Sequence, residues 1–108
     1  MIDALVIEDH VDIQELLVDQ LEDKGCQVQS ASNGSAGLRR IKNRKPDIIF
    51  VDIIMPVMDG IGFISELQEN PETFEIPIVV VTAINLPEVK TRAAELGVSL
   101  VLAKPWSL

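Results

Sequence analysis

Polar residues stand directly after four short apolar runs of this chain, where their side chains could do chemistry together. The runs are 4–7, 48–51, 78–81 and 100–103, and the residues that follow them are Glu8 and Asp9, Asp52, Thr82 and Lys104. One polar residue after an apolar run is ordinary, but three carboxylates, a hydroxyl and a lysine in such positions are not. This set suits phosphoryl chemistry, in which a metal ion and an ammonium group neutralise phosphoryl oxygens and an aspartate can be the nucleophile.

The three carboxylates also predict a bound cation. Two unit charges about 4 Å apart repel by roughly 4 kcal/mol at an effective dielectric of about 20, so three in one cleft favour either protonation or a cation. A hard divalent ion suits oxygen ligands, and Mg²⁺ usually keeps several waters beside one or two carboxylates. Lys104 adds a positive charge but cannot neutralise the group.

Segments of helical periodicity separate the apolar runs, and this order determines where the polar residues lie. In the first helical segment, Ile13, Leu17 and Leu21 fall on one face. Asp12 is placed to cap that helix and Gly25 to end it. Apolar strands that alternate with helices are typical of repeated βαβ units, which form a parallel sheet with helices on both faces. Residues at the carboxyl ends of the strands then meet at one edge, where ligands bind in such folds.

Length and charge narrow the class of protein. A chain of 108 residues fits one domain with one hydrophobic core. The net charge of −8 argues against nucleic acid as a direct partner, and cations in the basic stretch 39–45 are favourable at a helix C-terminus. Cys26 is the single cysteine, no basic leader precedes the first strand, and no apolar window reaches the roughly 20 residues of a membrane span. We therefore expect a cytoplasmic protein without a membrane span.

The acidic pair belongs to an ordered set of short motifs. The set is Glu8-Asp9, Asp52 with Met55-Pro56 and Asp59-Gly60, Thr82-Ala83, and Lys104-Pro105. In order and spacing it resembles the receiver domain of response regulators, over nearly the whole chain. The resemblance implies a flavodoxin-like, doubly wound fold with a five-stranded parallel sheet in the order 2-1-3-4-5, and one receiver domain over residues 1–108. It also implies a phosphoacceptor of two-component signal transduction, not an enzyme, that catalyses only its own phosphorylation and dephosphorylation.

By this resemblance, Asp52 is the phosphoacceptor and takes its phosphoryl group from a histidine kinase or a histidine phosphotransfer protein. Mg²⁺, with Mn²⁺ as an alternative, would be bound by Asp9, by Asp52 and by the backbone carbonyl of Ile54. Glu8 would act on the metal through a water molecule. His10 directly follows the acidic pair, and we expect an ordinary solvated loop residue there.

The resemblance also implies which groups hold the phosphoryl oxygens. Lys104, the hydroxyl of Thr82 and the backbone amide of Ala83 would bind them. A cis peptide bond before Pro105 would aim Lys104 into the site. The residues that would shape the loop after the acceptor strand are Pro56 and Gly60.

Four features differ from the usual receiver pattern, and the first is Glu8, which stands where the family more often has aspartate. Val101 occupies a switch position where receiver domains usually have an aromatic residue, so we expect output through backbone shifts or another surface. The sequence ends at Leu108, and the expected fifth helix would be absent, truncated or replaced by a partner element. Gly37 falls within the second helix, at a cost of about 1 kcal/mol if the position is exposed.

Two other functions share parts of this pattern. Aspartate-nucleophile phosphohydrolases also combine an α/β fold, Mg²⁺ and a lysine, but they carry a second aspartate where this chain has Ile54. A docking domain that keeps the receiver fold without phosphorylation is favoured by Val101. It is opposed by the retained Asp9, Asp52, Thr82 and Lys104. The sequence does not identify the output partner, and it does not decide whether the chain forms a homodimer.

Overall fold

The computed structural model describes residues 1–52, 60–82, 91, 94, 95, 97, 98 and 100–103. Within these ranges strands and helices alternate. The elements are β1 (Asp3–Ile7), α1 (Val11–Asp23), β2 (Gln27–Ala31), α2 (Gly34–Asn43), β3 (Ile48–Asp52), α3 (Gly60–Glu69), β4 (Ile78–Thr82) and β5 (Leu100–Ala103). Between β4 and β5, positions 91, 94 and 95 are described and are helical, and the expected fifth helix lies outside the described residues. The predicted α/β class is confirmed.

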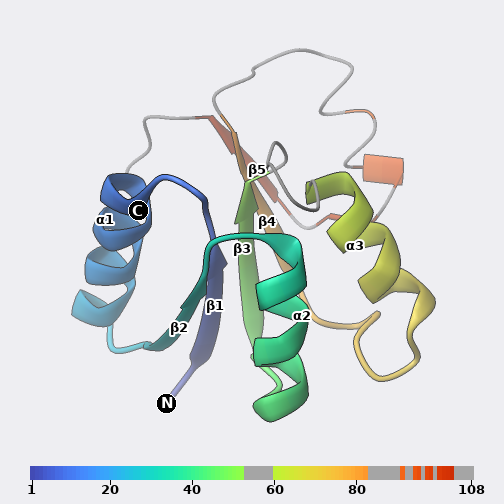
Figure 1. Cartoon of the computed structure of the whole chain (residues 1–108), viewed down its shortest axis with the longest axis horizontal. Helices are drawn as coiled ribbons and strands as arrows, with labels where there is room; N and C mark the ends of the chain where they lie inside the picture. Colours follow the sequence, from blue (N-terminus) through green and yellow to red (C-terminus); the bar gives the residue numbers. More distant parts are fainter. Residues whose placement is uncertain (53–59, 83–90, 92–93, 96, 99, 104–108) are drawn as a thin grey trace.

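The strands form one parallel sheet in the order β2-β1-β3-β4-β5. Because all strands run in the same direction, their carboxyl ends lie along one edge. The chain leaves β1 towards β2 on one side and returns to place β3 on the other, so strand order reverses between β1 and β3 (Figure 1). Ligands of open parallel sheets bind at this kind of reversal.

Helices cover both faces of the sheet, with α1 on one side and α2 and α3 on the other (Figure 1). Alternate residues of β1 supply the two faces: Leu5 and Ile7 pack on the α2–α3 side, whereas Ala4 and Val6 pack against α1. All four are at most 1% exposed, which explains why this strand is a continuous apolar run. In the described part of the chain, no helix has the length and apolar character needed to cross a lipid bilayer.

Gly37 is buried within α2, not exposed as a simple helix-weakening residue would be. A Cβ atom at this position would lie 2.5 Å from Cδ1 of Ile7 and 3.2 Å from Cε1 of Phe63. Ile7 is 1% exposed and Phe63 is fully buried, so neither side chain can move into solvent. The glycine therefore lets α2 approach β1 and α3 closely.

The starts of the first two helices differ in their capping. The prediction that Asp12 caps α1 is wrong: the helix begins at Val11, and His10 occupies the N-cap position without a side-chain cap. In α2 the side chain of Asn33 accepts a hydrogen bond of 2.8 Å from the amide of Ala36, a standard N-cap. Beginning α1 at Val11 leaves a very short connection after β1 and keeps the acidic pair close to the sheet.

Candidate functional site

The backbone positions of several predicted site residues lie along the carboxyl edge of the sheet. Glu8 and Asp9 follow β1, Asp52 is the last residue of β3, and Thr82 is the last residue of β4. Ile7 lies opposite Val51 in the β1–β3 pair, so the next step along each strand brings Glu8 level with Asp52. The sheet register therefore places the acidic segment beside the end of β3.

For the remaining predicted site residues, the structure describes the backbone alone or does not include the residue. The side chains of Asp52, Thr82 and Val101 lie outside the described part, and Gly60 is described as the first residue of α3. The predicted residues wholly outside the described ranges are Ile54, Pro56, Ala83, Lys104 and Pro105. Their roles stay predictions.

Glu8, Asp9 and His10 form a compact polar cluster at this edge. Glu8 is only 3% exposed, and its Oε2 accepts a hydrogen bond of 3.2 Å from the His10 amide. Nδ1 of His10 lies 3.4 Å from the same oxygen and 3.3 Å from Oδ1 of Asp9. The three side chains offer ligand atoms that all lie within 4.8 Å of one another.

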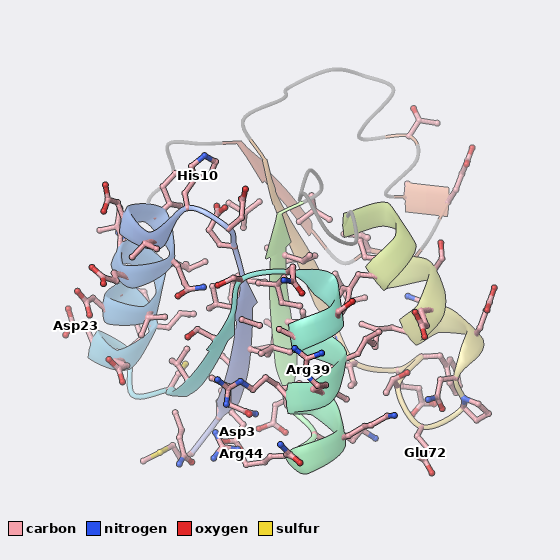
Figure 2. The ribbon with its side chains drawn as sticks, in the orientation of Figure 1. Asp3, His10, Asp23, Arg39, Arg44 and Glu72 are labelled. Carbon is pink, nitrogen blue, oxygen red and sulfur yellow. The ribbon has the colours of Figure 1, made fainter. Side chains whose placement is uncertain are left out.

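His10 is thus closer to the acidic pair than the sequence suggested. Its side chain is 66% exposed, in agreement with a solvated residue, yet its ring nitrogen contacts both carboxylates. Figure 2 shows it at the end of the sheet opposite Asp3 and Arg44. In the sequence, the one signal for this contact is that His10 directly follows Asp9. That signal is weak, because neighbouring side chains of an extended loop point away from each other.

A second residue that sequence reasoning missed is Gln14, in the first part of α1. Its side-chain nitrogen donates hydrogen bonds to the backbone oxygens of Glu8, at 2.9 Å, and Ala31, at 3.0 Å. The amide of Glu8 donates to the same Ala31 oxygen at 3.0 Å. The polar loop after β1 is therefore anchored to β2 and to α1 at once.

The chemistry of this cluster fits a hard divalent cation. Burial of an ionised carboxylate such as Glu8 is costly unless other groups compensate its charge. The carboxylate oxygens of Glu8 and Asp9 are ligands that Mg²⁺ accepts, and the Asp9 side chain is 26% exposed and so is open to an ion from solvent. The residues present can therefore hold such an ion directly or through water.

Comparison with known proteins identifies the family. The family model described as "Response regulator receiver domain" matches residues 4–108 of this chain. A probable chemotaxis protein CheY of Rhizobium etli is 35% identical over 108 residues, which cover 99% of this chain and 84% of that protein. A solved structure of the chemotaxis protein CheY4 of Vibrio cholerae superposes with a TM-score of 0.93 at 28% identity, and the match covers 99% of this chain and 89% of that one.

Similarity also extends to a larger protein. The protein-glutamate methylesterase/protein-glutamine glutaminase 2 of Methanosarcina mazei is 35% identical over 109 residues, which cover 97% of this chain. The match spans only 29% of that relative's length.

Proposed function

Because this chain belongs to the family of response-regulator receiver domains, we propose that its carboxyl-edge site accepts a phosphoryl group on Asp52. Receiver domains are phosphoacceptor signalling modules of two-component systems and not classical enzymes. The observation that carries the proposal is the β1–β3 register, which brings the acidic segment after Ile7 level with Asp52, the last residue of β3. In this proposal residues 1–108 form one receiver domain that catalyses only its own phosphorylation and dephosphorylation.

Mg²⁺ binding at an acidic site is general to receiver domains, and Glu8 and Asp9 supply such a site here. The proposed ligands are the carboxylates of Asp9 and Asp52 and the backbone carbonyl of Ile54, with Glu8 acting through a water molecule; Mn²⁺ could take the same ligands. A bound divalent ion neutralises charge on the phosphoryl oxygens. Glu8 supports this site because the hydrogen bond from the His10 amide holds its buried carboxyl group in place, where it can accept a bond from metal-bound water.

The proposed transfer step follows from the same residues. A carboxylate oxygen of Asp52 forms a bond to phosphorus while the phosphorus–nitrogen bond of a phosphohistidine breaks. The electron pair of the broken bond stays on the imidazole, which then takes up a proton. The groups proposed to bind the phosphoryl oxygens are Lys104, the Thr82 hydroxyl and the Ala83 amide, with Pro56, Gly60 and a cis Pro105 shaping the surrounding loops.

Receiver domains are phosphorylated by histidine kinases, and a histidine kinase or a histidine phosphotransfer protein is the proposed donor here. The proposed output is a change in the binding of a partner protein or output domain. Because Val101 lacks the bulk of an aromatic residue, this output uses backbone shifts or another surface.

The acceptor assignment can be tested with a small phosphoryl donor. Purified protein is incubated with acetyl phosphate and Mg²⁺, and its intact mass is measured at intervals. We expect the mass increase of one phosphoryl group in the wild-type protein and none in Asp52→Asn. The matched control is Asp19→Asn, which makes the same chemical change at an exposed position of α1.

Addition of EDTA before the donor separates the role of the metal from that of the aspartate. We expect no adduct without a divalent ion and full adduct formation in Asp19→Asn with it. An adduct that persists in Asp52→Asn would contradict the acceptor assignment. Rapid multiple turnover of phosphate esters would instead indicate a phosphohydrolase.

A further inference from the structure

We infer that Gln14 is a positioning residue for the cation site, because its side chain fixes the peptide unit from which Asp9 projects. This inference rests on the proposed function in one respect: the cation concerned is the Mg²⁺ of the phosphorylation site. Gln14 acts through the backbone, since the two bonds that its side chain makes go to carbonyl oxygens of Glu8 and Ala31.

The two side-chain bonds use the full donor capacity of the amide group. A primary amide nitrogen carries two N–H groups, and Nε2 of Gln14 donates to Glu8 O at 2.9 Å and to Ala31 O at 3.0 Å. Both partners are carbonyl oxygens, which only accept hydrogen bonds. The nitrogen and not the oxygen of the amide must therefore face them, so the orientation of the Gln14 side chain is determined by its partners.

These bonds continue the sheet where its own ladder ends. The last paired residues of β1 and β2 are Ile7 and Ala31, and the Glu8 amide still donates to the Ala31 oxygen at 3.0 Å. Gln14 then joins that oxygen to the Glu8 carbonyl. Both peptide units that flank the Glu8 Cα atom are thereby hydrogen-bonded.

Planarity of the peptide group carries this restraint to Asp9. The Glu8 carbonyl lies in one plane with the nitrogen and Cα atom of Asp9, and rotation out of that plane is costly. A bond to the Glu8 oxygen therefore also fixes where the Asp9 side chain begins. Asp9 itself lies beyond β1 and before the first helical residue, Val11, so neither element holds it by regular structure.

Gln14 is held firmly enough to act as an anchor. Its backbone amide donates to the His10 carbonyl at 2.9 Å, the first bond of the α1 ladder. The side chain thus projects from a packed helix whose Leu17 and Leu21 are buried against the sheet. One residue connects the start of α1, the loop after β1 and the end of β2.

Removal of the anchor should weaken metal binding without changing any metal ligand. Residues that orient metal ligands typically change metal affinity by about 10- to 100-fold when they are replaced. Gln14 acts on the ligand through the backbone, so we expect the low end of that range, about a tenfold rise in the Mg²⁺ dissociation constant. The test variant is Gln14→Met, which keeps the length and helix propensity of the side chain but has no N–H donor.

A matched control exists at the other end of the molecule. Nε2 of Gln29 donates to the backbone oxygen of Arg44 at 3.1 Å, so Gln29→Met also removes a side-chain amide bond to a carbonyl. Arg44 lies near Asp3, away from the His10 end of the sheet (Figure 2). A loss of general stability should appear in both variants, whereas a loss of metal affinity should appear in only one.

The experiment measures Mg²⁺ affinity by calorimetry and, in metal-free protein, hydrogen exchange of backbone amides by NMR. In Gln14→Met we expect about tenfold weaker Mg²⁺ binding and faster exchange of the Glu8 amide, with both quantities unchanged in Gln29→Met. Gln14→Ala replaces the methionine variant if that one does not fold.

Unchanged Mg²⁺ affinity in Gln14→Met, or an equal loss in Gln29→Met, would overturn the positioning role and leave only a structural one. If the Glu8 amide exchanged as slowly in Gln14→Met as in the wild-type protein, the idea that Gln14 restrains the backbone at Glu8 would be overturned. Mg²⁺ binding by a wild-type protein that forms no adduct on Asp52 would refute the proposed function, while the same titration would still decide the role of Gln14.

Discussion

Substitution of Gly37 by alanine tests whether close packing or helix propensity determines the residue at this position. In an exposed helix the change from glycine to alanine stabilises by up to about 1 kcal/mol. Here the added Cβ would meet Ile7 Cδ1 at 2.5 Å, and both Ile7 Cγ1 and Phe63 Cε1 at 3.2 Å. Overpacking of a filled core costs about 1–3 kcal/mol. With a mid-range cost of about 2 kcal/mol, we expect Gly37→Ala to lower the free energy of unfolding by about 1 kcal/mol.

The measurement is urea unfolding followed by far-UV circular dichroism, which reports the free energy of unfolding by linear extrapolation. Ile7→Val provides a double-mutant cycle, because valine lacks the Cδ1 atom that the new Cβ would meet most closely. Alone, Ile7→Val should cost about 0.5–1.5 kcal/mol. Combined with Gly37→Ala it should cost less than the sum of the two, with a favourable coupling of at least about 0.5 kcal/mol.

A comparison within the chain separates propensity from packing. Gly62 lies in the first turn of α3 and is exposed, so Gly62→Ala should be neutral or stabilising. The packing explanation would be refuted if Gly37→Ala stabilised the protein as much as Gly62→Ala. It would also be refuted if the effects of Gly37→Ala and Ile7→Val were simply additive.

Two further substitutions test local hydrogen bonds by the same unfolding measurement. Asn33→Ala removes the side-chain oxygen that accepts a hydrogen bond of 2.8 Å from the Ala36 amide, and should lower the free energy of unfolding by about 1 kcal/mol. Asn33→Asp keeps an acceptor and should retain most of the stability; equal losses in the two variants would show that the cap is unimportant. Thr73→Val removes the buried hydroxyl that donates to the Leu67 carbonyl at 2.7 Å, and should cost about 1–3 kcal/mol without changing phosphoryl acceptance. A loss of adduct formation in a folded Thr73→Val protein would be evidence against the view that this bond is purely structural.

The sequence determined the α/β class because the strands and helices each have a local signature. A strand buried on both faces must be apolar throughout, as Ala4 to Ile7 are, and a helix on the sheet needs an apolar stripe, as Leu17 and Leu21 provide. Parallel strands then require polar residues after each run to meet at one edge. This is why the acidic pair and Asp52 could be assigned to one site from the printed sequence.

The same local rules could not settle features that depend on which segments meet in space. Gly37 looks like a weak point in a helix until Ile7 and Phe63 are seen to fill the space beside it. Asp12 is a good N-cap residue, but α1 begins one residue earlier, at Val11.

The site shows the same division. The sequence alone determined that carboxylates, a hydroxyl and a lysine follow apolar strands, since residue type and position along a strand are local properties. Only the tertiary structure decided that the His10 ring turns back onto Glu8 and Asp9, and that Gln14 reaches two carbonyls, one of them on β2. Those contacts depend on the β1–β2 pairing and on the residue at which α1 starts. Neither of these can be read from the pattern of residue types.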